Sequence, residues 1–165
     1  ETVIAENGGI VYAEDQVTVT GDPERAQAVA EEFVARGGEM GWGAADTVNR
    51  WRETEVAVAQ AADERLLQTV ADEHDMQVVD TGYAYHVKTP AVEKWAGLEA
   101  VAETLGCEAS EFVAVGDSEN DVSTFAVAGP AYAVNNADDA AKEAADHVTD
   151  RGYFDGAIEV LTSVK

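Results

Sequence analysis

The chain has 165 residues, 46% of them hydrophobic, which is enough to build a buried core and excludes a disordered chain. Its 33 acidic residues outnumber 10 basic ones, giving a formal net charge of -23 at pH 7. This balance excludes a partner bound through nucleic-acid phosphates and docking on an anionic membrane. The acids are spread along the whole chain. They suggest either an acidic surface for a basic partner or a surface adapted to high salt, and we favour the second.

The first 20 residues predict a short buried strand followed by a hairpin. Residues 2–5, Thr-Val-Ile-Ala, are strand-like and mostly apolar, and Asn7-Gly8-Gly9 is a turn signal. Residues 10–12 and 17–20 are strand-like and flank Glu14-Asp15, which is typical of a hairpin.

Residues 21–88 predict two helices that cover a small sheet. Asp22 and Pro23 suit the N-cap and first position of a helix that ends at Gly37-Gly38, and Asp63 caps a second helix. Residues 54–59, 77–80 and 83–88 resemble strands. Residues at helical spacing mark the apolar faces of the two helices, namely Ala26, Val29, Ala30, Phe33 and Val34, then Leu67, Val70, Ala71 and His74.

Thr89-Pro90 is a predicted boundary, and strands alternate with helices after it. The elements are a helix ending at Gly106, a strand at 112–115, a helix opened by a Ser118/Asp121 capping box, a strand at 131–134, a helix at 138–145, a strand at 147–149 and a helix at 155–161. The first helix has the apolar face Trp95, Leu98, Val101, Ala102 and Leu105. This alternation predicts a parallel, doubly wound α/β sheet.

Two carboxylates lie where the strand at 112–115 ends. Asp117 follows that end, where sites form in parallel sheets, with Asn120 and Asp121 close behind. Mg²⁺ would remove the repulsion between the carboxylates, because it binds one or two of them with waters and a substrate phosphate. The alternative is a solvated helix N-terminus, where the helix dipole favours acids. A calcium loop is rejected, because Val122 and Ala128 stand where it needs glycine and glutamate.

Residues 113–121, Val-Ala-Val-Gly-Asp-Ser-Glu-Asn-Asp, resemble the fourth motif of the haloacid dehalogenase superfamily, in particular its archaeal phosphoglycolate phosphatase and Cof-type branch. Glu6-Asn7-Gly8-Gly9 resembles the segment leading into that branch's cap domain, and Glu93-Lys94 resembles its third motif. Asn136-Ala137 and residues 150–156 resemble its C-terminal part.

The resemblance implies a haloacid-dehalogenase-like α/β fold, with a doubly wound parallel sheet as a partial core and an inserted α+β cap. Residues 1–20 would be the end of the N-terminal core segment and the hairpin into the cap. Residues 21–88 would be the cap that selects the substrate, and residues 89–165 the C-terminal part of the catalytic core.

The resemblance also implies a magnesium-dependent phosphomonoester hydrolase that acts on a small phosphorylated substrate, foremost phosphoglycolate. Asp117 would be catalytic and bind Mg²⁺ directly, Asp121 would bind the ion or its water shell, and Asn120 would position the loop or the phosphate. Lys94 would contact the phosphoryl group and the nucleophile. A phosphate needs local positive charge on so acidic a protein, which supports Lys94 independently. If the family resemblance is set aside, an exposed lysine at the start of a helix is an equally good interpretation of Lys94.

The family's nucleophile motif, Asp-x-Asp-Gly-Thr, and its Ser or Thr motif have no counterpart in the chain, and no Asp-x-Asp occurs in it. The family would place both motifs before Glu1. We therefore expect residues 1–165 alone to be inactive, because no aspartyl-phosphate can form.

Two other functions stay open: a sugar-phosphate phosphatase of the same superfamily, and a non-catalytic acidic binding module on the same fold. The single cysteine allows no disulfide within the chain, no signal peptide opens it, and no uncharged run is long enough to span a membrane. We expect a cytoplasmic protein, and a homodimer stays open. We expect structural roles for His74, His86, His147 and Cys107, and core positions for Trp42 and Trp51. The glycine-rich residues 37–43 are expected to form a turn, and a cap loop that faces the substrate stays open.

Overall fold

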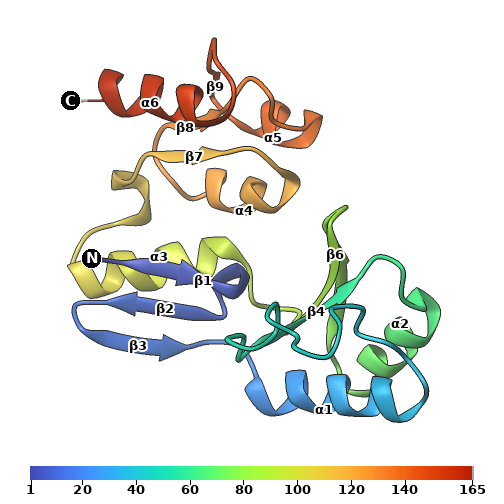
Figure 1. Cartoon of the computed structure of the whole chain (residues 1–165). Helices are drawn as coiled ribbons and strands as arrows, with labels where there is room; N and C mark the ends of the chain where they lie inside the picture. Colours follow the sequence, from blue (N-terminus) through green and yellow to red (C-terminus); the bar gives the residue numbers. More distant parts are fainter. Residues whose placement is uncertain (165) are drawn as a thin grey trace.

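The computed structural model describes residues 1–164, which form three sheets of three strands each (Figure 1). The strand orders are β1-β2-β3, β4-β6-β5 and β7-β8-β9. The first two sheets are antiparallel and the third is parallel. The predicted mixture of α and β elements with a parallel sheet is therefore confirmed.

The N-terminal sheet contains the predicted hairpin. Its elements are β1 (Val3–Ala5), the 3-10 turn η1 (Glu6–Gly8), β2 (Ile10–Ala13) and β3 (Gln16–Val19). Ala13 pairs with Gln16, so Glu14 and Asp15 form a two-residue turn, and their φ angles of 51° and 61° match a type I′ hairpin. The prediction that the first strand is buried is wrong. Val3 is 54% exposed, because β1 is an edge strand that pairs with β2 alone in the described chain.

Residues 23–88 form a two-layer α/β unit. Its elements are α1 (Pro23–Ala35), β4 (Glu55–Ala59), α2 (Glu64–Glu73), β5 (Gln77–Asp80) and β6 (Ala84–Lys88). The predicted caps are confirmed, since Asp22 and Asp63 accept hydrogen bonds of 3.0 Å from the first turns of α1 and α2. Val34 is 52% exposed, against the prediction, because it points away from the sheet on which Phe33 packs.

The two faces of the β4-β6-β5 sheet differ in chemistry. Its apolar face packs on α1 and α2 in a core that includes Val56, Val58, Val87, Phe33 and Leu67. Because side chains alternate along a strand, the opposite face carries Glu55, His86 and Lys88, with Glu55 opposite Lys88 in the register. This polar face is not covered by either helix of the unit.

The C-terminal residues build the predicted parallel sheet. The elements are α3 (Lys94–Leu105), η2 (Ala109–Glu111), β7 (Ala114–Gly116), η3 (Glu119–Asp121), α4 (Val122–Phe125), β8 (Ala131–Ala133), α5 (Asp139–Ala144), β9 (His147–Val148) and α6 (Tyr153–Ser163). Phe125 and Ala141 pack on the strands in a core made mostly of alanines. Gly106 ends α3 with a φ of 70°, as predicted, but Leu105 is 43% exposed, because it lies in the last turn, beyond the buried face of the helix.

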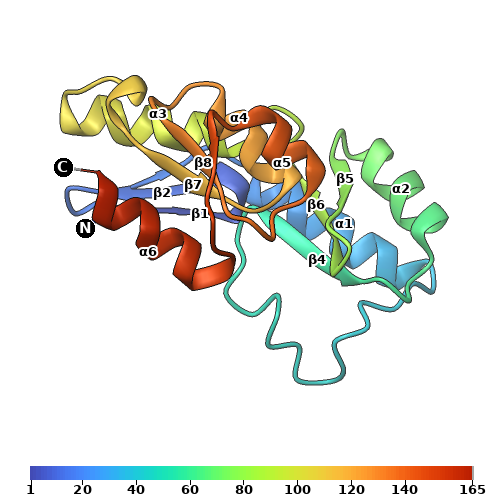
Figure 2. The ribbon, with the colours of Figure 1, turned by 90° about the horizontal axis from the view of Figure 1, so that it is seen from above.

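Helix α3 lies between two of the three sheets. Helix α3 contacts β1 and β2 on one side and α4 on the other, so it joins the N-terminal sheet to the parallel sheet (Figure 1). The two-layer unit lies beside them, and residues 36–54 project from it as a long loop (Figure 2). Within residues 1–164, no helix has both the length and the apolar composition needed to cross a bilayer.

Candidate active site

The loop after β7 places Asp117 at the carboxyl end of the parallel sheet. Asp117 is exposed, and its carboxylate makes no hydrogen bond or ion pair within residues 1–164. Its backbone is fixed, because its N–H donates to Asp121 Oδ2 at 2.9 Å and its carbonyl accepts from Asp138 N–H at 3.0 Å. The structure thus holds this residue in place while leaving its two carboxylate oxygens open to a ligand.

The side chain of Asp121 holds the loop together through hydrogen bonds. Its Oδ2 accepts the N–H groups of Asp117 and Ser118 at 2.9 and 3.2 Å, which confirms the predicted pairing of Ser118 and Asp121. Its Oδ1 accepts Lys94 Nζ at 2.6 Å. Gly116 makes room for this arrangement, since a Cβ there would lie 2.5 Å from Asp121 Oδ2. Both oxygens of Asp121 are therefore occupied by protein donors.

Lys94 joins the loop from the first residue of α3. Its Nζ also donates to Asn120 Oδ1 at 2.9 Å, and that oxygen accepts the Ser118 hydroxyl at 2.7 Å. A cation at a helix start is opposed by the helix dipole, and the Asp121 carboxylate offsets this cost. The structure thus brings the four predicted residues together: Lys94, Asn120 and Asp121 by direct bonds, and Asp117 through its backbone.

A cavity of about 540 Å³ lies beside this cluster; Lys94 and Asn120 line it, whereas Asp117 and Asp121 do not. One side is formed by Lys94 and the loop after β7, and the other by residues 77–81 and Lys88 of the two-layer unit. It is lined by Asn7, Gln77, Val78, Val79, Asp80, Thr81, Lys88, Glu93, Lys94, Ser118, Glu119, Asn120, Ser123 and Asp138. Asn7, Lys88 and Asp138 were not predicted as site residues.

Two of these three residues, Asp138 and Asn7, lie in segments that the sequence had marked for another reason. Asp138 caps α5 through Oδ1, and its Oδ2 accepts Glu119 N–H at 2.7 Å, so one side chain supports two elements of the site. Asn7 lies in the segment that resembles the lead into a cap domain, and a φ of 54° sets its backbone. For Lys88 the sequence carried no signal beyond its place at a strand end.

The carboxylates of the loop suit a hard divalent cation. Mg²⁺ takes one or two carboxylates and fills its other positions with water and phosphate oxygens, and Asp117 offers free oxygens for such a bond. Within the described residues, no group of three or more His, Cys, Asp or Glu side chains is placed to hold a metal ion. The exposed carboxylate of Asp117 differs in kind from the four Cys and His ligands that hold structural zinc.

A buried charged cluster ties the N-terminal sheet to the two-layer unit. Glu55 is 2% exposed and accepts Asn7 Nδ2 at 2.8 Å, lies 3.2 Å from His86 Nδ1 and pairs with Arg52. Burial, and then the Arg52 guanidinium, lowers the pKa of His86. Glu6 makes a second tie, since its carboxylate accepts the Thr54 N–H and hydroxyl at 2.6 Å each. These bonds fix the sheet that carries Lys88 relative to the start of the chain.

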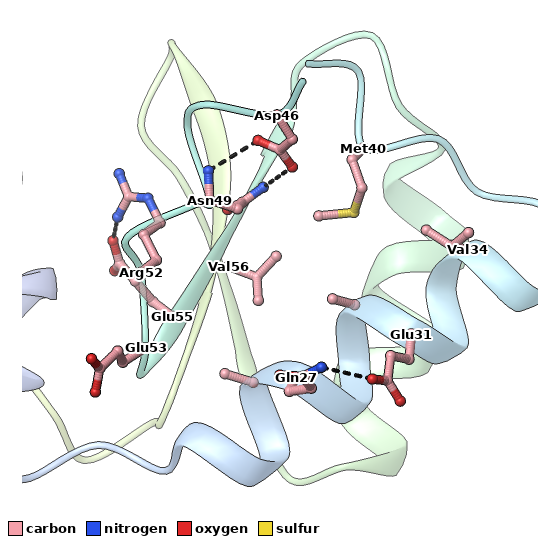
Figure 3. Close-up of a pocket in the computed structure, with 12 residues that line it drawn as sticks. Gln27, Glu31, Val34, Met40, Asp46, Asn49, Arg52, Glu53, Glu55 and Val56 are labelled. Carbon is pink, nitrogen blue, oxygen red and sulfur yellow. Dashed lines mark hydrogen bonds and ion pairs between the residues drawn. The ribbon is translucent and has the colours of Figure 1, made fainter. Parts of the chain in front are cut away.

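A second cavity of about 520 Å³ lies within the two-layer unit (Figure 3). It opens between α1 and the loop that carries Asp46, Asn49 and Arg52, and Arg52 is turned to Glu55. Acidic side chains prevail around it, and no residue of the loop after β7 reaches it. It offers no predicted site residue and little attraction for a phosphate.

The tryptophans and His74, which were expected to have structural roles, make contacts within the protein, but the expectation that Trp51 lies in the core is wrong. Trp51 is 79% exposed and is not the predicted core residue, because it lies on the projecting loop, where Arg50 stacks on its ring. Trp42 is half-buried, with Nε1 donating to the Ala57 carbonyl at 2.8 Å. His74 Nε2 lies 2.6 Å from a carboxylate oxygen of Glu32.

Comparisons with known proteins place this fold and loop in one family. The sequence profile of a family described as haloacid dehalogenase-like hydrolase matches residues 51–161. A protein of Halorubrum lacusprofundi named phosphoglycolate phosphatase is 59% identical over 100% of this chain and 74% of its own length. One of Natronomonas pharaonis with the same name is 57% identical over 96% of this chain and 71% of its length.

Solved structures agree with the fold. A Thermoplasma acidophilum protein superposes with a TM-score of 0.76 at 24% identity, over 94% of this chain and 68% of that one. A haloacid dehalogenase-like hydrolase of Bacteroides thetaiotaomicron gives 0.74 at 18% identity, over 98% and 75%. The chain belongs to the haloacid dehalogenase-like hydrolase family.

Proposed function

We propose that the protein is a magnesium-dependent phosphomonoester hydrolase whose substrate is phosphoglycolate. The observation that carries the proposal is the cluster of Lys94, Asn120 and Asp121 beside the open carboxylate of Asp117, at the edge of a cavity large enough for a small phosphorylated acid. Three relatives that are 47–59% identical over 96–100% of the chain are named phosphoglycolate phosphatase, which supports the choice of substrate.

Each residue has a role that its surroundings support. Asp117 would hold Mg²⁺, with Asp121 behind it as a second ligand or as a support of the ion's water shell. The ion, when bound, supplies positive charge that stabilises the transferring phosphoryl group. Lys94 supplies a second positive charge, directed by Asp121, and Asn120 holds Lys94 and can turn its amide toward a phosphate oxygen.

The reaction requires an aspartate nucleophile outside residues 1–165. Its carboxylate oxygen would attack phosphorus, the ester P–O bond would break, and the departing alkoxide would take a proton from solvent to give glycolate. Water then attacks the phosphorus of the aspartyl-phosphate and releases inorganic phosphate. Strand β7 has a free edge within the described residues, because it pairs with β8 alone, and Val113 and Val115 are 36% and 38% exposed beside it. A further strand at this edge would end beside Asp117.

Residues 21–88 would act as the cap that selects the substrate, and residues 89–165 as the C-terminal part of the core. The support is the cavity itself, since its lining comes from both segments. Residues 1–20 would then connect the core to the cap through Glu6 and Asn7. We place the reaction in the cytoplasm, in keeping with the single free Cys107.

The test is a phosphatase assay on the product of the open reading frame that encodes these residues, read through any codons before Glu1. Phosphoglycolate, sugar phosphates and a neutral phosphomonoester are compared with Mg²⁺ and with a chelator, for the wild type and Asp117→Asn. We expect Mg²⁺-dependent turnover, fastest with phosphoglycolate, that Asp117→Asn reduces by at least about 100-fold. Full activity in the chelator, or in the variant, contradicts the metal site. A preference for sugar phosphates contradicts the substrate, and the absence of any turnover favours a binding module.

A further inference from the structure

Lys88 is a buried cation without an anion. This last residue of β6 is 7% exposed, and its Nζ makes one hydrogen bond, to the Val92 carbonyl oxygen at 2.6 Å. No carboxylate lies within ion-pair distance of it in residues 1–164, although the chain carries 33 acidic residues. Lysines are almost never this buried unless they are paired, because an unpaired buried charge is costly. The ammonium group has three donors and uses one of them on a protein atom.

The position of Lys88 is as informative as its burial. The chain has four lysines, Lys88, Lys94, Lys142 and Lys165, and two of them, Lys88 and Lys94, line the same cavity. Lys94 extends from α3 toward the loop after β7 and is held there by Asp121. Lys88 stands on the polar face of the β4-β6-β5 sheet, beside Gln77 in the register. The cavity thus has one cation on the loop side and another on the sheet side.

The contact with Val92 does not by itself explain a lysine at this place. A neutral donor would satisfy one carbonyl oxygen and avoid the cost of burying charge. Burial lowers the pKa of Lys88, opposed in part by Glu93, because burial disfavours the charged form of a lysine. An anion entering the cavity would relieve that cost, and its carboxylate or phosphate oxygens could accept the two unused donors.

We infer that Lys88 binds the carboxylate of the substrate, at the end of the cavity away from the phosphoryl group held by Lys94. This inference rests on the proposed function and narrows it. The site is built for short phosphorylated acids, with anionic groups at both ends, and not for sugar phosphates, whose leaving groups are neutral. Lys88 is then the residue that separates these two substrate classes.

The test compares two substrates that differ at one end. Phosphoglycolate and 2-hydroxyethyl phosphate share a two-carbon leaving group, which ends in a carboxylate in the first and in an alcohol in the second. In the intact protein, Lys88→Met should lower the ratio of kcat/KM for phosphoglycolate to that for 2-hydroxyethyl phosphate by about 10- to 100-fold. The rate with 2-hydroxyethyl phosphate should change less than about threefold. Lys142→Met, on α5 and outside the cavity, is the matched control and should leave the ratio unchanged.

A ratio in Lys88→Met within about threefold of the wild type overturns the inference. Lys88→Gln is the control for misfolding, because the glutamine amide can still donate to the Val92 carbonyl while the charge is lost. It should lose phosphoglycolate preference as fully as Lys88→Met does. If Lys88 had a structural role alone, Lys88→Gln would keep the preference and Lys88→Met would lower the melting temperature. We expect the melting temperature of Lys88→Met to be equal to or higher than that of the wild type.

Calorimetric titration with glycolate and with inorganic phosphate separates this inference from the proposed function. Lys88→Met should lose glycolate binding by at least about tenfold and keep phosphate binding within about threefold. If the wild type fails to hydrolyse phosphoglycolate but Lys88→Met still loses glycolate binding, the proposed function fails and the carboxylate site stands. If the wild type prefers phosphoglycolate and Lys88→Met binds glycolate normally, the function stands and this inference is wrong.

Discussion

Asp117 and Asp121 lie four residues apart in one loop, yet their surroundings predict very different effects on stability when each is replaced. Asp121 is 14% exposed at its side chain and accepts two backbone N–H groups and the Lys94 ammonium. Asp121→Asn keeps one oxygen, so its amide must face either the two N–H groups or Lys94. A hydrogen bond to a charged group contributes about 1.5–3 kcal/mol, and a half-exposed ion pair about 1 kcal/mol or less. We expect Asp121→Asn to lower the free energy of unfolding by about 2 kcal/mol.

Asp117→Asn serves as the matched variant. Its carboxylate is exposed and has no partner within residues 1–164, so we expect a change of no more than about 0.5 kcal/mol. Mg²⁺ at 100 times its dissociation constant should stabilise the wild type by about 2.7 kcal/mol, and Asp117→Asn should lose that gain.

Urea unfolding in fixed KCl, followed by circular dichroism with and without Mg²⁺, measures all four quantities. The interpretation of the loop is wrong if Asp121→Asn loses less than about 0.5 kcal/mol, or if Asp117→Asn loses as much as Asp121→Asn does. A Mg²⁺ gain that Asp117→Asn retains would instead remove Asp117 from the metal site while leaving the structural role of Asp121 intact.

Three further predictions use the same unfolding measurement. Raising KCl from about 0.1 to about 1 M shortens the Debye length from about 10 to about 3 Å, so the urea midpoint should rise, and a constant midpoint would contradict surface self-repulsion at a net charge of -23. His86 has a lowered pKa, so the stability from its neutral form is present above its unfolded pKa of 6.5 and is lost as pH falls through the lower folded pKa. His86→Gln should therefore reduce the pH dependence of the free energy of unfolding below about pH 6.5. An unchanged slope would contradict the lowered pKa of His86. Gly8→Ala should cost at least about 2 kcal/mol, because φ is 99° and the new Cβ would overlap the backbone at the start of α3. Gly37→Ala, with a φ of 93° and open space, should cost about 1 kcal/mol, and equal losses would show that the overlap does not matter.

Features with a local cause were predictable from the sequence. Asp22 and Asp63 cap helices because each side chain bonds a backbone N–H three residues away. Glu14-Asp15 closes a hairpin because the strands on either side leave two residues between them. The loop from Gly116 to Asp121 was found because its acids follow a strand within one short motif.

Features that depend on distant parts of the chain were not predictable. Asn7 lines the cavity, and its side chain is held by Glu55, 48 residues away. Lys88 lines the cavity because β6 lies between β4 and β5, an order that no local pattern encodes. Trp51 was expected in the core because it is large and apolar, but exposure depends on where the projecting loop places it. Residue type and spacing thus identified the chemistry of the site, while the opposite wall of the cavity required the tertiary structure.

The net charge of the cavity lining predicts that phosphate binding and metal binding are coupled. Four acidic residues line it, Asp80, Glu93, Glu119 and Asp138, against the two lysines, so its lining has an excess of two negative charges before Asp117 is counted. A phosphate dianion would be repelled from such a lining, and Lys94 is already engaged by Asp121. A divalent cation at Asp117 would balance the excess of the lining. Phosphate affinity and metal affinity should therefore be coupled, and because coupling between two ligands is reciprocal, phosphate should tighten the binding of Mg²⁺ by the same factor.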